Sequence, residues 1–579
     1  MSRANRALDV KKKNRRKVIR TIFQIIILAC LIWVLVQTLF TIRTYEEPVR
    51  STWHSRGGFI ALTYFGVGRN GTSTFIDDDR LMEQLETLKN LGFVTVSQQD
   101  LIDFYEKGSP LPDRALFLAF EDGRNDSALY AQGILEKLNY RATMMTYADK
   151  MIRHERKFLR PKQLQNMADS GYWEIGSNGN RFTYINIHTE SGDFYGMLED
   201  IEFDQLRGVT SYNHYLMDFL RDRRMIPVEN RDEMFARINS DYAALAGQYR
   251  KAFGYVPHVY MIMHANALYG GINPLVEEAN DGNIRRLFDL HFNREGAAYN
   301  SPDDDPYNLT RLQVPPYWYT NHLLMKLRLD TGMDLPFVTG DERRAERWEP
   351  ASGALQFLDE RMVLTSPPYD HGVAVLKGSG GYTDVELDVE LSGNVVGEHG
   401  LLLRYDRTRQ SYVRVAIRDL RLIVEEKLPG EPVTLLADEP IGPLAPVSDG
   451  GDAADTENAA NHAVTARTGA SYPVSLAQKI RLSVAVKGNT LSVAVDGKKL
   501  ADEIVIRAER GAVALTSRRS EHNVKDPIFD AVFDRLVITR TDVDPHEVVY
   551  RDRLEGLSLW LHRSKKWTDA VIDWAIEQF

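Results

Sequence analysis

Short apolar runs alternate with amphipathic stretches between residues 59 and 340. Residues 59–67 (FIALTYFGV) and 115–120 (ALFLAF) are apolar segments with the length and composition of buried strands. Between them, residues 78–92 carry apolar side chains at helical spacing and end at Gly92, which predicts an amphipathic helix. This alternation predicts parallel strands joined by helical crossovers, arranged either as a barrel or as a doubly wound sheet.

The same rhythm continues beyond the second strand, with one long interruption. A polar, aromatic-rich segment spans 188–236, and an interruption of 49 residues inside a compact domain predicts an elaborated surface loop over the strand ends. Its aromatic side chains suit either packing within that loop or stacking on sugar faces. Further strands are predicted at 93–97, 141–148, 173–178 and 256–266, and further helices at 160–171 and 237–254.

The pattern changes at about residue 351. Many short segments with two-residue alternation follow, such as VELDVELSG and LSVAVDGKKL, and they predict an antiparallel β-sandwich over residues 346–542. Within it, residues 440–473 are rich in Ala, Gly, Asp and Asn, which predicts a disordered excursion. Residues 543–579 carry Leu, Val and Trp at roughly helical intervals and predict a C-terminal helical tail.

The N-terminus has the pattern of a membrane anchor. Residues 1–20 hold nine Lys or Arg and one acidic residue, and the 22 residues at 21–42 are uncharged and strongly apolar, long enough for a helix that crosses a bilayer. The basic residues predict a cytoplasmic tail at 1–20, a transmembrane helix at 21–42, a stalk at 43–57 and an extracellular remainder. A cleaved signal peptide is the alternative, but residues 41–45 (TIRTY) offer no small-residue cleavage site.

Composition narrows the class of partner. The chain of 579 residues has a formal net charge of −10, and the part beyond the basic N-terminus is more acidic still, which argues against a nucleic-acid partner. Its length suits two or three domains. The single cysteine, Cys30, lies in the predicted transmembrane helix, so no intrachain disulfide can form.

Candidate chemistry begins where the strand 115–120 ends. Glu121, Asp122 and Gly123 form an acidic turn there, and α/β barrels place their reactive groups at the carboxyl ends of strands. Two carboxylates at such a turn suit a catalytic site, or they form a solvated strand end without chemistry.

The order of segments over residues 58–345 resembles the polysaccharide deacetylase family, whose members share the NodB homology domain. The resemblance rests on ALTYFGV, LMEQLETLKNLGFVTVSQQDLIDFYEKGSPLPDRALFLAFEDG and LRPKQLQNMADSGYWEIGSN. It implies a distorted (β/α) barrel that removes acetyl groups from glycans. It also implies a divalent metal held by the second Asp of a Thr-Phe-Asp-Asp-Gly turn and by two His four residues apart, with the first Asp as general base.

This chain departs from that pattern at most of the metal ligands. Glu121 takes the position of the base and Asp122 keeps a ligand position, but Asn178 and Phe182 stand where the family has its two His. An amide oxygen is a weak ligand for zinc-like metals, and a phenyl ring is none. We therefore expect no metal cofactor, and a zinc-like divalent metal only if the chain is an active enzyme with a rearranged site.

Polar residues near the expected mouth of the barrel complete the predicted site. Asn178 and Arg181 suit the binding of sugar hydroxyls, and they equally suit a turn that needs particular backbone angles. His264 also falls near the mouth, where it either joins Asp122 and His188 in a substitute metal site or is an ordinary core residue. The predicted sandwich resembles concanavalin-like and laminin-G-like domains, which often bind carbohydrate but in many cases only pack against a neighbour.

Three functions remain open. The first is a membrane-anchored extracellular pseudoenzyme, without metal, that binds or organises a polysaccharide of the cell envelope through Asn178, Arg181 and His264. The second is an active, divergent deacetylase that uses Glu121, Asp122 and His264. The third is a structural partner of a membrane glycan synthase or export complex that binds no sugar.

Overall fold

A computed structural model describes residues 44–441 and 479–552, apart from 73, 154, 395, 522, 524 and 525, together with the isolated residues 20, 21, 24, 25, 28 and 564. Two compact units, Met1–Pro48 and Val49–Phe579, make up the chain. Most of the predicted transmembrane helix at 21–42 and of the predicted excursion at 440–473 lies outside the described residues. Among the residues that are described, no helix is both long enough and apolar enough to cross a membrane.

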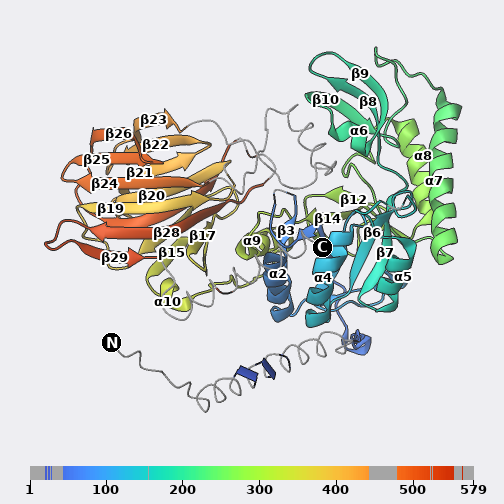
Figure 1. Ribbon diagram of the computed structural model, residues 1–579, viewed down its shortest axis with the longest axis horizontal. Coiled ribbons are helices and arrows are strands. Elements are labelled where there is room, and N and C mark those ends of the chain that lie inside the picture. The colour runs from blue at the N-terminus through green and yellow to red at the C-terminus, as the bar shows by residue number, and fades with distance from the viewer. Residues whose placement is uncertain are drawn as a thin grey trace, which may run out of the picture. The chain divides into compact units, whose positions relative to one another are not determined.

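Parallel strands close into a barrel in the first part of the larger unit (Figure 1). The barrel strands are β1 (Phe59–Tyr64), β5 (Ala115–Phe120), β6 (Ala142–Tyr147), β7 (Trp173–Gly179), β11 (Val259–Met261), β12 (Leu290–Glu295) and β14 (Leu309–Gln313). Their order is β1-β14-β12-β11-β7-β6-β5, and β5 pairs with β1 again, with Ile60 opposite Leu116, which completes the ring. The chain therefore adopts the barrel and not the doubly wound sheet. Two short strands, β4 (Val94–Thr95) and β13 (Tyr299–Asn300), extend this sheet, and β2 (Val67–Gly68) pairs with β3 (Ile76–Asp77).

Helices connect most of the barrel strands and begin at capping residues that the sequence supplies. They are η1 (Arg50–Thr52), α2 (Asp78–Asn90), α3 (Gln98–Lys107), α4 (Asn125–Leu138), α5 (Pro161–Asp169), α7 (Arg231–Phe253), α8 (Pro274–Leu287), α9 (Thr320–Thr331) and α10 (Glu342–Ala345). Ser97 and Asp100 form a capping box at the start of α3, and Gly108 ends that helix in the left-handed conformation. Asn230 and Glu233 form a second capping box at the start of α7.

The segment predicted as a surface loop at 188–236 is largely structured. It contributes to a three-stranded antiparallel sheet, made of β8 (Thr183–Thr189), β9 (Phe194–Glu199) and β10 (Val209–His214), and holds the short helix α6 (Asp200–Asp204). The loop prediction is wrong because apolar residues of the insertion and of the strand before it pack with residues of the barrel in one buried cluster. Tyr184 stacks on Phe203 with ring centroids 4.2 Å apart, and both residues are buried.

The strand predicted at 256–266 is shorter than expected. Strand β11 keeps only Val259–Met261, and a loop follows it before α8. His264, Asn266 and Tyr269 in this loop have φ angles of 56°, 67° and 63°. Left-handed backbone of this kind cannot continue a strand. The loop therefore begins at the carboxyl end of β11, where the mouth of the barrel lies.

Two antiparallel sheets form the C-terminal part of the larger unit (Figure 1). In strand order, the first is β15 (Trp348–Ser352), β18 (Gly372–Leu376), β27 (Ala512–Arg519), β20 (Gly397–Asp406), β21 (Ser411–Arg418), β22 (Arg421–Lys427) and β23 (Thr434–Pro440). The second is β16 (Ala354–Leu358), β17 (Arg361–Thr365), β28 (Asp530–Arg540), β19 (Val385–Ser392), β24 (Ile480–Lys487), β25 (Thr490–Val495) and β26 (Lys498–Val505). One buried cluster takes apolar side chains from both sheets, among them Leu387, Leu401, Leu482 and Leu515.

The predicted helical tail at 543–579 is wrong at its start. Residues Glu547–Arg551 form strand β29, which pairs antiparallel with β28. Tyr550 is 5% exposed, and its ring packs edge-on against Trp348 with centroids 5.2 Å apart. Because consecutive valines favour extended backbone and Tyr550 completes the sheet core, a strand forms here. Residues 553–579, apart from Ser564, lie outside the described residues.

A buried charged cluster connects α9 to the C-terminal sheets. The two ring nitrogens of His322 lie 3.0 Å from Asp530 and 3.1 Å from Asp526. Trp318 stacks on this imidazole and donates a hydrogen bond to Asp526 at 2.8 Å. Burial lowers the pKa of His322, but the two carboxylates outweigh burial and raise it to about 9. The charged imidazole therefore holds α9 against the sheets at neutral pH.

Candidate functional site

The acidic turn lies at the carboxyl end of β5, in the mouth of the barrel. Glu121 and Asp122 are buried, with only 1% and 4% of their surfaces exposed, so they are not a solvated strand end. Asp122 and Gly123 both have left-handed backbone, with φ angles of 67° and 66°. A Cβ atom at Gly123 would lie 3.0 Å from the side chain of Thr146, which would have to shift, so glycine is favoured there. Backbone geometry therefore fixes the turn.

Side chains from the last barrel strand hold Glu121. Arg311 donates from Nε to Oε1 of Glu121 at 3.1 Å, and Gln313 donates to Oε2 at 3.2 Å. Arg311 is itself 1% exposed and lies 3.6 Å from Glu295 at the end of β12. A buried carboxylate is tolerated when a guanidinium and further hydrogen bonds compensate the loss of water. The carboxylate at the base position is thus fixed by two partners from β14.

Asn178, which the sequence resemblance aligns with the first family His, is committed to backbone groups. Its Oδ1 accepts a hydrogen bond from the backbone N–H of Asp122 at 3.1 Å, and its Nδ2 donates to the backbone oxygen of Met261 at 3.1 Å. These two bonds tie the ends of β5, β7 and β11 together. Asn178 is 4% exposed. Its amide therefore serves as a brace between strands, and its oxygen is already engaged on the turn that holds Asp122.

Phe182, which the sequence resemblance aligns with the second family His, lies inside an aromatic cluster. Its side chain is 1% exposed, and its ring centroid is 3.9 Å from that of Tyr147 at the end of β6. Phe158 and Met263 belong to the same buried cluster. Burying a phenyl ring in such a cluster contributes about 2 kcal/mol from the removal of apolar surface from water. This position therefore supports the cluster that joins the barrel mouth to the insertion sheet, and it offers no ligand atom.

Arg181 is anchored by a buried carboxylate from α7. Its Nε donates to Oδ1 of Asp241 at 2.8 Å, and Asn180 donates to the same oxygen at 2.8 Å. Burial raises the pKa of Asp241 in spite of these two partners. The guanidinium also lies 5.0 Å from the ring of Tyr215, and the Arg181 side chain remains 33% exposed. Arg181 is thus held in place while part of it still faces solvent.

Two imidazoles stand beside this arginine. The rings of His264 and His214 are 5.8 Å apart, and Tyr212 lies 5.8 Å from His264. His214 donates from Nε2 to the backbone oxygen of Arg181 at 3.1 Å and accepts from the Leu216 N–H at 3.4 Å. Burial, and next the neighbouring His264, lower the pKa of His214 to about 3; burial lowers the pKa of His264 to about 4. Both imidazoles are therefore neutral at pH 7.

The predicted substitute metal ligands do not gather around one point. His188 lies on β8, where its Nε2 is 3.2 Å from the sulfur of Met225. In the described part of the chain, a single group brings three ligand atoms within 4.8 Å of one another, and it contains neither Asp122, His188 nor His264. By the sequence resemblance, the three metal-binding positions of the family correspond to Asp122, Asn178 and Phe182. They offer one carboxylate, one amide that is already bonded to backbone, and one phenyl ring. This donor set does not fit a zinc-like ion.

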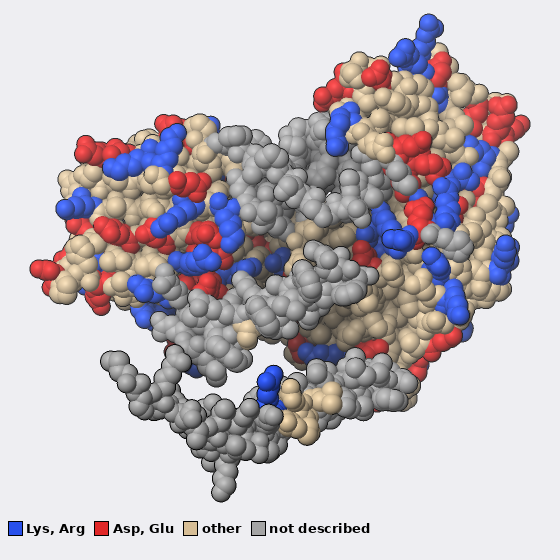
Figure 2. All heavy atoms as spheres, in the orientation of Figure 1, with Lys and Arg blue, Asp and Glu red and all other residues tan. Residues whose placement is uncertain are grey.

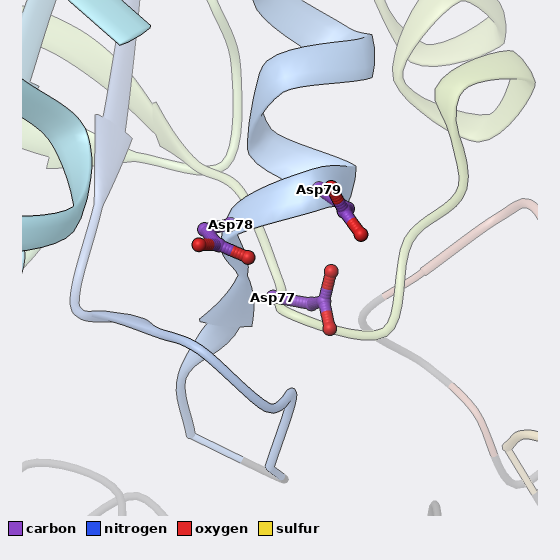
Figure 3. Close-up of side chains that lie close together, drawn as sticks. All are labelled: Asp77, Asp78 and Asp79. Carbon is purple, nitrogen blue, oxygen red and sulfur yellow. The ribbon is translucent and has the colours of Figure 1, made fainter. Parts of the chain in front are cut away.

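The group of three ligand atoms consists of Asp77, Asp78 and Asp79 at the start of α2 (Figure 3). Asp77 accepts a hydrogen bond from the backbone N–H of Arg80 at 3.2 Å and so caps the helix. Carboxylates in a first helical turn are also favoured by the helix dipole. Burial, and next the neighbouring carboxylates, raise the pKa of Asp78 to about 6. Capping accounts for these acids without a bound ion.

Four residues that hold the site are missing from the sequence prediction. Arg311 is the one with a usable signal, because it is a charged residue inside the apolar strand pattern LTRLQV. Its neighbour Gln313, the insertion residue His214 and the helix residue Asp241 have no distinguishing pattern. They are revealed only when the barrel closes and brings β14, β10 and α7 to the same mouth.

Comparison with known proteins finds similar solved structures but no matching sequence or sequence family. No protein-family model matches the chain, and no curated protein sequence matches it. Among solved structures, a de-N-acetylase from Aggregatibacter actinomycetemcomitans is similar, with 19% identity, coverage of 45% of this chain and 95% of that chain, and a TM-score of 0.35. IcaB from Ammonifex degensii matches with 17% identity, coverage of 45% and 93%, and a TM-score of 0.32. The carbohydrate-binding module CBM66 from Bacillus subtilis matches with 14% identity, coverage of 33% and 94%, and a TM-score of 0.23. Likenesses of this strength do not assign an activity to this chain.

Proposed function

We propose that the chain is a polysaccharide deacetylase-like protein of the cell envelope that binds or organises a glycan without a metal cofactor. One observation carries the proposal: the two positions that should supply imidazole ligands are used for structure. Asn178 braces Asp122 to Met261, and Phe182 is buried against Tyr147. Catalytic zinc sites normally need three protein ligands. Asp122 is the single retained ligand position, and one ligand is too few to hold a metal for hydrolysis.

The same mouth retains groups that suit sugar hydroxyls. Arg181 is half-buried and fixed by Asp241, so little side-chain entropy is lost when its free edge binds a ligand. His264 lies in the loop that follows the neighbouring strand β11, whereas both polar groups of Asn178 are already bonded to backbone. Each hydrogen bond to a hydroxyl contributes about 1 kcal/mol net. A few such contacts predict dissociation constants on the order of micromolar to millimolar.

Anchoring and location complete the proposal. Residues 21–42 cross the membrane, residues 1–20 remain in the cytoplasm, and the barrel and a concanavalin-like sandwich lie outside the cell. The support is the basic tail before an uncharged segment of 22 residues. Protease added to intact cells should digest the chain beyond residue 57. Complete protection of that part, with digestion after permeabilisation, would reverse the topology.

Binding of an oligosaccharide tests the glycan role. We expect the full chain to bind an acetylated N-acetylglucosamine tetramer in a calorimetric or NMR titration, and Arg181→Ala to weaken binding about fivefold. Arg231→Ala is the matched control, because Arg231 is a 51% exposed arginine on α7 outside the mouth. If the tetramer does not bind, the third function, a structural partner of a glycan synthase, replaces the proposal. If Arg181→Ala and Arg231→Ala behave alike, binding lies outside the mouth.

One observation favours the alternative of an active, divergent deacetylase. Glu121 keeps a carboxylate at the base position, and Arg311 and Gln313 hold it in place. In that enzyme, Glu121 would accept a proton from the attacking water, and Asp122 and His264 would contact the substrate. Acetate release from the tetramer distinguishes the two functions. We expect the unmodified chain to release acetate no faster than a Glu121→Gln variant. Acetate release by the unmodified chain that is lost in Glu121→Gln would show that the chain is an active deacetylase.

A further inference from the structure

Charged side chains line a pocket on the C-terminal sheets, far along the chain from the barrel mouth. The pocket has a volume of about 180 Å³ and lies at the ends of β21 and β27. Basic and acidic side chains are interspersed over the face of these sheets in view (Figure 2). The charge that the pocket offers to a ligand therefore depends on which of its side chains are already paired. Its lining residues are Arg418, Asp419, Arg518, Arg519, Ser520 and Glu521.

One wall of the pocket is fixed by a buried carboxylate. Glu398 of β20 is the cross-strand partner of both Arg418 and Arg518, so the three side chains leave the sheet on the same face. Glu398 is 1% exposed at its side chain and accepts from Nε of Arg418 at 2.7 Å. Arg414 donates to the other oxygen of Glu398 at 3.2 Å. Arg418 is therefore held rigidly, and Arg414 and Arg418 balance the charge of Glu398.

Arg518 is the arginine with the weakest partner. Its side chain is 33% exposed, and its ion pair is with Glu521 at 3.7 Å, a residue that is 88% exposed. An exposed pair at that distance contributes little. Asp419, the other acid of the pocket, accepts from the hydroxyl of Ser520 at 2.7 Å. A ligand carboxylate can therefore take the place of Glu521 beside Arg518 at small cost.

An aromatic ring lies beside Arg519, one of the residues that line the pocket. Tyr369 is 72% exposed, and the guanidinium of Arg519 lies 5.1 Å from its ring. The backbone N–H of Tyr369 donates to Pro527 at 2.8 Å, which fixes the loop that carries the ring. Arg519 donates to the backbone oxygen of Asn523 at 2.7 Å, so it too is held in place. An exposed aromatic face beside Arg519 suits a sugar ring that carries a negative charge.

From this arrangement we propose that the pocket is a second glycan site, specific for a sugar residue that bears a carboxylate, such as a uronic acid. Arg518 pairs with the carboxylate in the bidentate manner of a guanidinium, Arg418 contributes charge, and Tyr369 stacks on the ring. The pocket is smaller than the roughly 300–1,000 Å³ of sites for drug-sized ligands, so it holds one sugar residue. Glu521 occupies the carboxylate position in the free protein and is displaced on binding.

Opposite effects of two substitutions test this site. The probe is D-glucuronate, titrated by NMR into the full chain, with D-glucose as the neutral counterpart. We expect glucuronate to bind more tightly than glucose, Arg518→Gln to weaken glucuronate about tenfold, and Glu521→Gln to strengthen it about threefold. Tyr369→Ala should weaken both sugars. Arg481→Ala is the control, because Arg481 is 69% exposed on β24 of the other sheet, and it should change nothing.

Three outcomes overturn the proposal. Equal binding of glucuronate and glucose, or no binding of either, removes the carboxylate specificity. Inorganic phosphate that binds as well as glucuronate, with no effect of Tyr369→Ala, reduces the pocket to a general anion site. Loss of glucuronate binding in Arg181→Ala with no change in Arg518→Gln would move the ligand to the barrel mouth. Both tested arginines are partly exposed, so these variants keep the fold.

Discussion

The two sides of the barrel mouth are equally buried but chemically different. On the β14 side, Glu121 keeps a carboxylate, and Arg311 and Gln313 hold it. On the β7 side, Asn178 bonds to backbone and Phe182 packs on Tyr147. The sequence resemblance aligns these two residues with metal-binding His. Burial at a strand end therefore does not identify a catalytic group. The partners of the buried group decide whether it can do chemistry or only hold the barrel together.

The largest expected effect on stability concerns the β14 side of the mouth, where Glu121 and Arg311 form an ion pair. Arg311→Met leaves the Glu121 carboxylate buried without its guanidinium, so we expect the free energy of unfolding to fall by about 3 to 5 kcal/mol. Urea denaturation followed by circular dichroism measures it. Adding Glu121→Leu to Arg311→Met should recover most of the loss, because no uncompensated charge then remains. A loss below about 1 kcal/mol for Arg311→Met would mean that Glu121 is not held as an ion pair.

On the β7 side, which we call the packed side, introducing a polar residue should destabilise the chain. Phe182→His restores the family residue but places an imidazole in an aromatic cluster, so we expect a loss of about 2 to 3 kcal/mol. Denaturation with and without added zinc checks this. Phe194→His is the control, since Phe194 on β9 is only partly buried, and it should cost less than about 1 kcal/mol. Stabilisation of Phe182→His by zinc would show that the ligand geometry is still present.

The neutral imidazoles on the packed side predict a dependence on pH. Burial, and next His264, lower the pKa of His214 from 6.5 to about 3 in the folded chain. Between these values the unfolded chain binds a proton that the folded chain does not. The stabilisation is complete above pH 6.5 and falls with decreasing pH by about 1.4 kcal/mol per unit for one imidazole.

His214→Gln tests this dependence, because glutamine can also donate to Arg181 and accept from Leu216. We expect the variant to lose less stability than the unmodified chain when pH is lowered from 6.5 to 5. Unfolding free energies measured across that range give the two slopes. Equal slopes would mean that His214 takes up a proton in the folded state.

The smallest effect concerns the brace between the two sides. Asn178→Ala removes the hydrogen bonds to Asp122 and Met261, so we expect a loss of about 1 to 2 kcal/mol. Asn70→Ala, at an exposed position, should change stability by less than about 0.5 kcal/mol. Faster hydrogen exchange at the Asp122 amide in Asn178→Ala would assign the loss to this bond. Unchanged exchange would remove Asn178 from its role as a brace.

The sequence predicts the barrel better than the site. The strand at 115–120 and the helix at 78–92 are found at nearly their true bounds, because apolar runs and Gly92 mark them locally. The insertion at 188–236 is missed as a sheet, since its core forms from aromatic residues whose partners are distant in the chain. Strand 256–266 is overextended because nothing local predicts the left-handed backbone of His264.

The site residues likewise divide into those marked by a local sequence pattern and those brought together by distant parts of the chain. Glu121 and Asp122 can be predicted, because a strand followed by an acidic turn is a local pattern. Asn178 is also named from the sequence, but its bond to Asp122 is not, and neither is the pair of Arg311 with Glu121, because barrel closure brings together residues 56 and 190 positions apart. Long-range pairing of this kind leaves no periodicity in the sequence. The charged pocket around Arg518 is hidden for the same reason, since the ends of β21 and β27, about 100 residues apart in the chain, both contribute to it.

Metal content tests the central claim most directly. The full chain is incubated with excess zinc, freed of unbound ions by gel filtration, and examined by elemental analysis together with Asp122→Ala. Because the packed side supplies a braced amide and a phenyl ring, we expect far less than one equivalent of zinc, with no difference between the two proteins. One equivalent of zinc in the unmodified chain, lost in Asp122→Ala, would contradict the account and support the active deacetylase.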